Sequence, residues 1–308
     1  MGDWRAAIWG RRFALRALAA QVLLLCCAAA AGASAAGDAE RGKAIFALAG
    51  GCGCHSMTEG PLGAGGRELP TPFGTFYGTN ITPDAETGIG AWSDTEIIAA
   101  IRDGIGRDGA VLSPVMPYYQ YAGMADADAR DLVAYLRTLA PARRENRTAE
   151  VSIPLARLAY RVWRRLYAPA VRAPAAAPTE ALARGRYLVD HVSICGDCHT
   201  PRTRFGALDE RYYLAGAAAG PDGDPVPNIT PDAETGLAKW TVEDFVALLQ
   251  TTMLPDMDNV QGLMAEVIEG CGGGPGYEHA PEADLLAIAT YMKTVPPIRR
   301  AAGEKRAQ

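Results

Sequence analysis

The sequence predicts an all-α protein made of two homologous domains in tandem, joined by a basic amphipathic helix. Three observations predict this fold class. Asn80–Gly88 and Asn228–Gly236 share the sequence NITPDAETG at an offset of 148 residues, which indicates an internal duplication. Apolar residues recur at helical spacing in each half of the chain. No stretch shows the polar–apolar alternation that is typical of a half-buried strand.

The first 35 residues, 1–35, are typical of an export signal. A basic segment with four arginines precedes an apolar run over residues 17–31, which is too short to span a bilayer comfortably. Ala33-Ser34-Ala35 fits a cleavage site of small residues. The alternatives are an uncleaved anchor and, less favoured, a lipoprotein site at Cys26 or Cys27.

Composition and charge narrow the class of protein. The apolar fraction is 49%, but aromatic residues make up only 7%, which suits helical domains around a large apolar prosthetic group. Removal of the export signal takes away four arginines and one aspartate, so the formal net charge changes from −5 to −8. An acidic chain of this kind is not a general nucleic-acid binder. No apolar run of membrane-spanning length follows the signal.

The first predicted domain covers residues 36–140. A short helix over 39–48 leads into a cysteine-rich loop, and the NITPDAETG segment follows. The sequence predicts a central helix over 93–103, with Ser93 as its N-cap, and a terminal helix over 126–139.

The second predicted domain, residues 179–298, repeats this plan, and residues 299–308 form a tail. Its helices are expected over 179–192, 241–250 and 281–293, and Thr241 is the expected N-cap of the central helix.

Residues 141–178 form the predicted linker, which is rich in alanine, proline and arginine. Its apolar residues fall on one helical face, and its arginines lie mostly off that face. The apolar set is Leu155, Leu158, Ala159, Val162, Trp163 and Leu166, and the arginines are Arg157, Arg161, Arg164 and Arg165. Two interpretations stay open: a connector helix packed across both domains, or a basic amphipathic surface that touches a membrane or an acidic partner.

A motif for covalent haem attachment lies in the second half. Cys195 and Cys198 are separated by two residues, and His199 follows directly. This spacing is typical of c-type haem, in which two thiols bond to the haem vinyl groups and the imidazole becomes an axial ligand of the iron. Pro201 is expected to orient the His199 ring through its backbone carbonyl, and His191 is expected to be a surface or packing residue.

The first half carries an incomplete version of this motif, with one residue between Cys52 and Cys54 before His55. Three states are open. Cys54 forms a single thioether and Cys52 stays unused, or Cys52 also attaches through a tightened loop, or the site holds no haem. An unused Cys52 would be available to pair with Cys271, although the sequence alone does not establish that the two are close.

Two methionines at one repeat position are the predicted second axial ligands. Met116 and Met264 are 148 residues apart, and each is expected on a loop between the central and terminal helices. Histidine–methionine ligation raises the reduction potential of a haem and suits electron transfer. The alternative ligands are Met124 in the first half and Met253, Met257 and His279 in the second.

Five segments carry a resemblance to a known family: TPFGTFYGTNITPDAETGIGAW, MPYYQY, CGDCHTPR, PNITPDAETG and ATYMKTVPP. They are spread over about residues 38–297. The chain resembles the di-haem c-type cytochromes related to the cytochrome subunits of membrane-bound alcohol and gluconate dehydrogenases. The resemblance implies two class I cytochrome c domains, two haem c groups, export to the periplasm, and electron transfer from a dehydrogenase to quinone or a terminal oxidase. Those subunits often carry three haems, whereas this chain has motifs for two, which favours a stand-alone or differently partnered carrier.

The predicted function is therefore one-electron transfer and not catalysis, with a dehydrogenase as donor and an oxidase or another cytochrome as acceptor. One alternative is a di-haem enzyme of the peroxidase or thiosulfate-oxidising type. Such an enzyme needs an open iron position, and a methionine candidate at each iron argues against it. The other alternative is a docking subunit whose main role is to hold a dehydrogenase.

Overall fold

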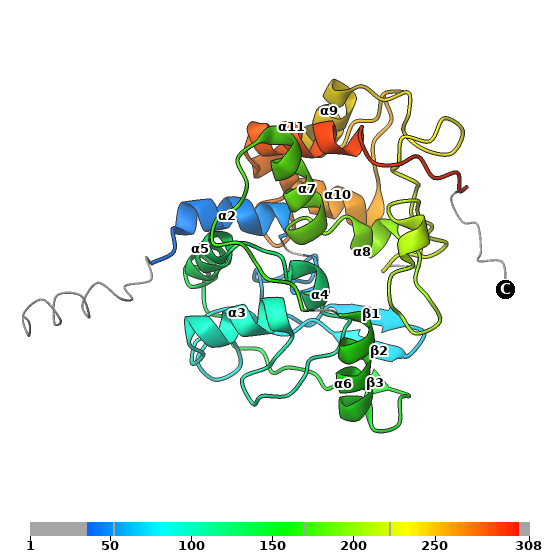
Figure 1. Ribbon diagram of the computed structural model, residues 1–308. Coiled ribbons are helices and arrows are strands. Elements are labelled where there is room, and N and C mark those ends of the chain that lie inside the picture. Colours follow the sequence, from blue (N-terminus) through cyan, green and yellow to red (C-terminus); the bar gives the residue numbers. More distant parts are fainter. Residues whose placement is uncertain (1–35, 52, 169, 222, 302–308) are drawn as a thin grey trace, which may run out of the picture. The chain divides into compact units, whose positions relative to one another are not determined.

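A computed structural model of the protein describes residues 36–301 apart from 52, 169 and 222. The predicted export signal, Cys52 and most of the predicted tail lie outside the described residues. The helices and strands follow one another as in Figure 1. Their bounds are α2 Ala39–Leu48, β1 Glu68–Thr71, β2 Gly74–Tyr77, α3 Asp94–Asp103, α4 Tyr118–Tyr121, α5 Asp126–Leu136, β3 Glu150–Val151, α6 Ala156–Tyr167, α7 Ala181–His191, α8 Gly196–His199, η1 Glu210–Tyr212, α9 Val242–Thr251, α10 Gly262–Glu269, η2 Tyr277–His279 and α11 Glu282–Met292.

The first and last helices of the first half cross at a glycine. A Cβ atom on Gly42 of α2 would lie 1.8 Å from the carbonyl oxygen of Asp131 on α5, so only glycine allows this approach. The neighbouring Arg41 donates from Nε to Asp131 Oδ2 at 2.8 Å. Buried Ile45, Phe46 and other apolar side chains then fill the contact.

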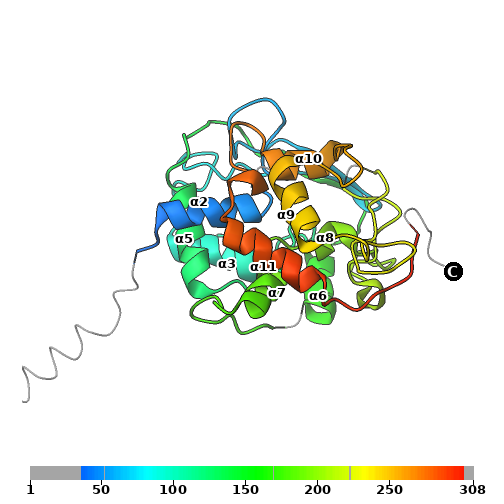
Figure 2. The ribbon, with the colours of Figure 1, turned by 90° about the horizontal axis from the view of Figure 1, so that it is seen from above.

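The second half repeats this crossing with α7 and α11, which lie across each other in Figure 2. A Cβ atom on Gly185 would lie 1.9 Å from the carbonyl oxygen of Ala287. Arg184 donates from Nε and Nη2 to Asp284, at 2.8 Å in both cases. Each half is therefore held by the same Arg-Gly pair on its first helix.

The predicted N-caps of the two central helices are confirmed. Ser93 caps α3 and forms a reciprocal capping box with Glu96, and Thr241 caps α9 and does the same with Asp244. Each box satisfies two backbone N–H groups that the first helical turn leaves unpaired.

The NITPDAETG segments form the same hydrogen bonds in both halves. Asn80 accepts from the backbone N–H of Thr82 at 3.0 Å and donates to the carbonyl of Ala142 at 2.7 Å. Asn228 accepts from the N–H of Thr230 at 2.9 Å and donates to the carbonyl of Ile298 at 2.7 Å. Each turn thus fastens the chain that leaves the terminal helix of its own half.

The prediction that the chain lacks strands was wrong, although helices dominate. The three strands form an antiparallel sheet in the order β1-β2-β3, with Glu68 opposite Tyr77 and Thr75 opposite Glu150. Each strand has four residues or fewer, and Pro70 and Gly74 interrupt the composition expected of a strand. No alternation over four to eight residues was therefore present to reveal them.

Polar contacts join the two halves, which belong to one compact unit beginning at Gly37. Tyr187 of α7 donates to Asp128 Oδ2 at 2.7 Å and accepts from the backbone N–H of Ala125 at 3.0 Å. Arg184 lies 3.6 Å from the same Asp128 carboxylate. His191 packs at this contact, with Nδ1 2.9 Å from the carbonyl oxygen of Gln120, which confirms that it is a packing residue.

A helix is present in the predicted linker, namely α6, and it contacts residues from both halves. The Trp163 ring lies 5.2 Å from that of Tyr119, and its Nε1 donates to the carbonyl of Phe205 at 2.8 Å. The boundaries proposed for two domains and a linker remain predictions. Between residues 36 and 301, none of the described helices combines the length and apolarity that crossing a bilayer requires.

Candidate haem-binding sites

The second motif is built by a single short turn of helix. Cys195 directly precedes α8, and the backbone N–H of His199 donates to the Cys195 carbonyl at 3.0 Å. Cys195 and Cys198 are free, half-buried thiols. The turn places both thiols and the imidazole of His199 within one segment, as covalent haem attachment requires.

The His199 ring is oriented by a residue that lies far along the chain. Nδ1 of His199 lies 2.9 Å from the carbonyl oxygen of Pro227. The prediction that Pro201 plays this role was wrong, because the Pro201 carbonyl instead accepts the backbone N–H of Asp209 at 2.8 Å.

The first motif has the same histidine geometry. Nδ1 of His55 lies 2.8 Å from the carbonyl oxygen of Thr79, which is 148 residues before Pro227. Cys54 is a free thiol that is accessible to solvent, and Cys52 lies outside the described residues. The shortened loop has therefore not changed the contact that fixes the ring of His55.

Both histidines are prepared to bind a metal through their second nitrogen. A carbonyl oxygen only accepts hydrogen bonds, so Nδ1 carries the proton in each ring and Nε2 keeps its lone pair. Burial lowers the pKa of both His55 and His199, which favours the neutral form that binds iron.

The thiols lie close enough to influence one another. Burial raises the pKa of Cys54 to about 11 and that of Cys195 to about 12, and it also raises the pKa of Cys198. The Cys54 side chain is nonetheless accessible to solvent. A raised pKa together with solvent access is expected of a side chain that lines a concave part of the protein surface. The negative charge of Asp197 adds to the raised pKa of both Cys54 and Cys198, so the two motifs are neighbours in space.

Asp197, inside the second motif, connects that motif to the first half of the chain. Its Oδ1 accepts from Gln120 Nε2 at 2.8 Å, from the Tyr119 hydroxyl at 3.2 Å and from Arg202 Nη2 at 2.6 Å. Tyr119 and Gln120 belong to α4, which begins two residues after Met116. The sequence did not predict this network.

The predicted methionine ligands occupy different local structures. Met116 lies on the loop before α4, as predicted, whereas Met264 lies on α10 and not on a loop. Both are half-buried and pack against the core. Among the alternatives, Met124 is fully buried in the core, and the side chains of Met253 and Met257 are 40% and 76% exposed. His279 is also exposed, and its Nδ1 lies 3.3 Å from Glu278 Oε1.

Cys271 is disulfide-bonded. Cys54, Cys195 and Cys198 are free thiols, so none of them is its partner. The neighbourhood of Cys271 includes the loop that follows the first motif, because a Cβ atom on Gly272 would lie 3.3 Å from the carbonyl oxygen of Gly60.

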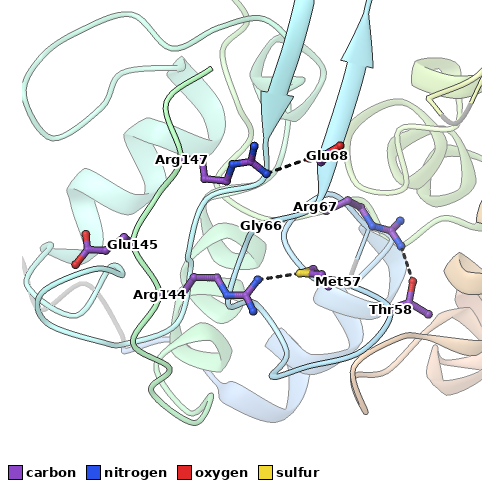
Figure 3. A pocket seen from close by; sticks show the side chains of 8 residues that line it. All are labelled: Met57, Thr58, Gly66, Arg67, Glu68, Arg144, Glu145 and Arg147. Atoms are coloured by element: carbon purple, nitrogen blue, oxygen red, sulfur yellow. Dashed lines mark hydrogen bonds and ion pairs between the residues drawn. The ribbon is translucent and has the colours of Figure 1, made fainter. Parts of the chain in front are cut away.

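A pocket of about 540 Å³ lies close to the first motif, since Met57 and Thr58 line it. Figure 3 shows the side chains of its lining. Arg144 Nη1 lies 2.8 Å from the sulfur of Met57, which is two residues after His55. Arg67 forms an ion pair with Glu266 of α10. The pocket thus lies where the loop after the first motif is fastened to α10, the helix that carries Met264.

These features identify the kind of protein. A cytochrome c sequence profile matches residues 39–140, and the chain belongs to the cytochrome c family. It is 36% identical over 271 residues to the diheme c-type cytochrome of Cereibacter sphaeroides, a match that covers 85% of this chain and 87% of that relative.

Two further relatives are subunits of dehydrogenases. The chain is 38% identical over 264 residues to the gluconate 2-dehydrogenase cytochrome c subunit of Pantoea cypripedii, covering 81% of this chain and 58% of that subunit. It is 34% identical over 269 residues to the cytochrome c subunit of the quinone-dependent alcohol dehydrogenase of Gluconobacter oxydans, covering 84% and 55%. The chain thus spans little more than half the length of these two subunits. A cytochrome c carries electrons at its haem iron, so this chain is an electron carrier rather than a catalytic enzyme.

The residues present fit a covalently bound haem. Free thiols stand beside both histidines, and each imidazole directs its Nδ1 proton to a carbonyl and keeps Nε2 for a metal. The second motif supplies both thiols, whereas the first supplies one within the described residues.

Proposed function

We propose that this protein holds two haem c groups and passes electrons from a dehydrogenase toward the respiratory chain. The observation that carries the proposal is the matching histidine geometry, His55 to Thr79 and His199 to Pro227, at two positions related by the internal repeat. The diheme relative from Cereibacter sphaeroides and the dehydrogenase subunits among the relatives agree with it. On this proposal each half is a class I cytochrome c domain, and α6 belongs to the linker between them.

The second haem would be held by thioethers from Cys195 and Cys198, with His199 and Met264 as the iron ligands. The first would be held through Cys54, with His55 and Met116 as the iron ligands. A bound haem supplies an iron that exchanges one electron at a time, at a potential that histidine–methionine ligation raises. The protein keeps both imidazoles neutral and oriented, and the Asp197 network holds the second attachment loop against α4, the helix that follows Met116.

For the first haem we propose a single thioether, from Cys54. Cys271 is disulfide-bonded, and the described thiols are excluded as its partner. If cleavage after Ala35 removes Cys26 and Cys27, the remaining cysteine is Cys52. A Cys52 engaged with Cys271 has no thiol to add to a vinyl group.

The proposed location is the periplasm, reached through the export signal. A disulfide in the chain supports an oxidising compartment, because disulfides form and persist in exported proteins and are rare in the cytosol. We further propose that α6 contacts a membrane surface, which would keep the carrier near its redox partners.

Intact mass of the exported protein tests the haem count, and two haems are expected. The pyridine haemochrome spectrum then reports vinyl saturation: one haem with two saturated vinyl groups and one with a single saturated vinyl group. A mass increase that corresponds to one haem would refute the two-haem proposal. Two haems whose vinyl groups are all saturated would refute the single thioether.

Cys54→Ser should remove the first haem alone, whereas Cys198→Ser should leave the second haem attached through Cys195. Met116→Ala and Met264→Ala should each abolish part of the near-infrared iron–sulfur band. An unchanged band in both methionine variants would overturn the ligand assignment.

A further inference from the structure

Helix α6 shows an apolar surface on the side that faces away from its contacts with the rest of the protein. Leu158, Val162 and Leu166 are spaced four residues apart and therefore share one face. Their exposed fractions are 55%, 51% and 66%, and Leu155 just before the helix is 78% exposed. The ring of Trp163, on a neighbouring face, packs against Tyr119 instead. We name Leu155, Leu158, Val162 and Leu166 the α6 stripe.

A band of arginines borders the α6 stripe. Arg161, Arg164 and Arg165 form no ion pair within the described residues, and no acidic residue occurs in the sequence between Glu150 and Glu180. The chain as a whole has a net charge of −5, so this concentration of positive charge is local.

These arginines line a pocket of about 390 Å³ that also involves α3 and α4. Arg102 and Asp103 at the end of α3 lie in its wall, and Arg102 is already paired with Asp126 at 2.6 Å. Asp103 is the carboxylate among the lining residues, so Arg161, Arg164 and Arg165 leave the pocket positively charged.

A buried hydroxyl without a partner belongs to the same pocket. Tyr118 of α4 lines the pocket, its side chain is 1% exposed, and its hydroxyl makes no hydrogen bond within the described part of the chain. An unpaired buried hydroxyl is costly, so a group that accepts its proton would be bound favourably. Arg164 lies close enough for its charge to act on this hydroxyl.

We propose that the pocket binds the phosphate of an anionic phospholipid while the α6 stripe enters the adjoining lipid surface. Phosphate oxygens accept hydrogen bonds from guanidinium groups and from hydroxyl groups, and the pocket contains both kinds of donor. A free phosphate ion would use the pocket but leave the stripe in water, whereas an amphipathic helix bordered by arginines is stabilised at an anionic membrane surface. The proposal deepens the membrane contact of α6 and is independent of electron transfer.

Vesicle co-sedimentation of the haem-loaded protein tests the lipid. Binding is expected to phosphatidylcholine vesicles that contain phosphatidylglycerol and to weaken as salt is raised, with little binding to phosphatidylcholine alone. The double variant Arg161→Gln/Arg164→Gln should bind about 25-fold more weakly, because each arginine near an anionic surface contributes about fivefold. Arg186→Gln, which removes an arginine that is 72% exposed on α7, is the matched control and should bind as the wild type does.

The double variant Leu158→Gln/Leu166→Gln tests the α6 stripe and should reduce vesicle binding at least about tenfold. Leu286→Gln on α11, where the leucine is 49% exposed, is its control. Circular dichroism and the haem spectrum show whether each variant is folded.

Soluble glycerol 3-phosphate separates the pocket from the stripe. Titration calorimetry should detect weak binding that Arg161→Gln/Arg164→Gln and Tyr118→Phe reduce and that Leu158→Gln/Leu166→Gln leaves unchanged. Equal binding to vesicles with and without phosphatidylglycerol would overturn the phosphate site while membrane contact stands. Absence of vesicle binding, with electron acceptance from a dehydrogenase impaired in the stripe variant, would assign the surface to a protein partner and overturn the proposal.

Discussion

Replacement of Asp197 by asparagine should affect both the stability of the protein and the potentials of the two haems. The asparagine oxygen still accepts hydrogen bonds from Tyr119 and Gln120, but it no longer neutralises Arg202. A hydrogen bond to a charged group contributes about 1 kcal/mol more than a neutral one. Three such bonds would give about 3 kcal/mol, and the partial exposure of the Arg202–Asp197 pair reduces the expected loss to about 2 kcal/mol.

This loss can be measured by thermal unfolding of the haem-loaded protein. For a chain of this size, 2 kcal/mol corresponds to a decrease in Tm of roughly 4–8 °C. Loss of a negative charge that acts on both Cys54 and Cys198 also destabilises the oxidised iron relative to the reduced iron, so the potentials of both haems should rise in a redox titration. Asp256→Asn, a change of the same charge at an exposed loop position, is the control and should alter neither quantity.

An unchanged Tm would refute the stabilising role of the Asp197 network. Unchanged potentials of both haems would show that the charge of Asp197 does not act on the iron sites.

The remaining predictions concern stability. Gly185→Ala places a Cβ atom 1.9 Å from the Ala287 carbonyl oxygen, which forces two helices apart, and should lower the unfolding free energy by about 1–3 kcal/mol in urea titration; an unchanged value would contradict the close crossing. Cys271→Ser removes the disulfide and should cost about 2–5 kcal/mol by the same assay, and no loss would show that the disulfide does not stabilise the exported protein. Hydrogen bonds from Thr87 lower the pKa of Asp84, so ionised Asp84 contributes stability above the ordinary carboxyl pKa, and this is lost as the pH falls through the lowered value. Asp84→Asn should therefore make the unfolding free energy less dependent on pH in the acid range, and an unaltered pH profile would argue against this contribution.

The sequence alone predicted those features that depend on residues close to one another along the chain. Helix α2 begins and ends at the predicted residues, and Ser93 and Thr241 cap their helices as predicted, because capping depends on a few neighbouring side chains. The internal repeat correctly indicated that the two halves would form equivalent turns.

Contacts between distant backbone groups could not be predicted in this way. The carbonyl that orients His199 belongs to Pro227, and a carbonyl acceptor has no residue type that marks it in a sequence. The Asp197 network was missed because Tyr119 and Gln120 come from the other half of the chain. The internal repeat offered one signal that the two histidines have equivalent carbonyl partners, because Pro227 lies 148 positions after Thr79.

The bonds of Asp128 to Tyr187 and Arg184 also limit how such chains can recombine. A chimera that joined the first half of this protein to the second half of a relative would keep its haem motifs but would need a matching pair of side chains opposite Asp128. Without them a carboxylate would be left at the junction with no partner. The junction between the duplicated halves is therefore a constraint on exchange in addition to the haem motifs.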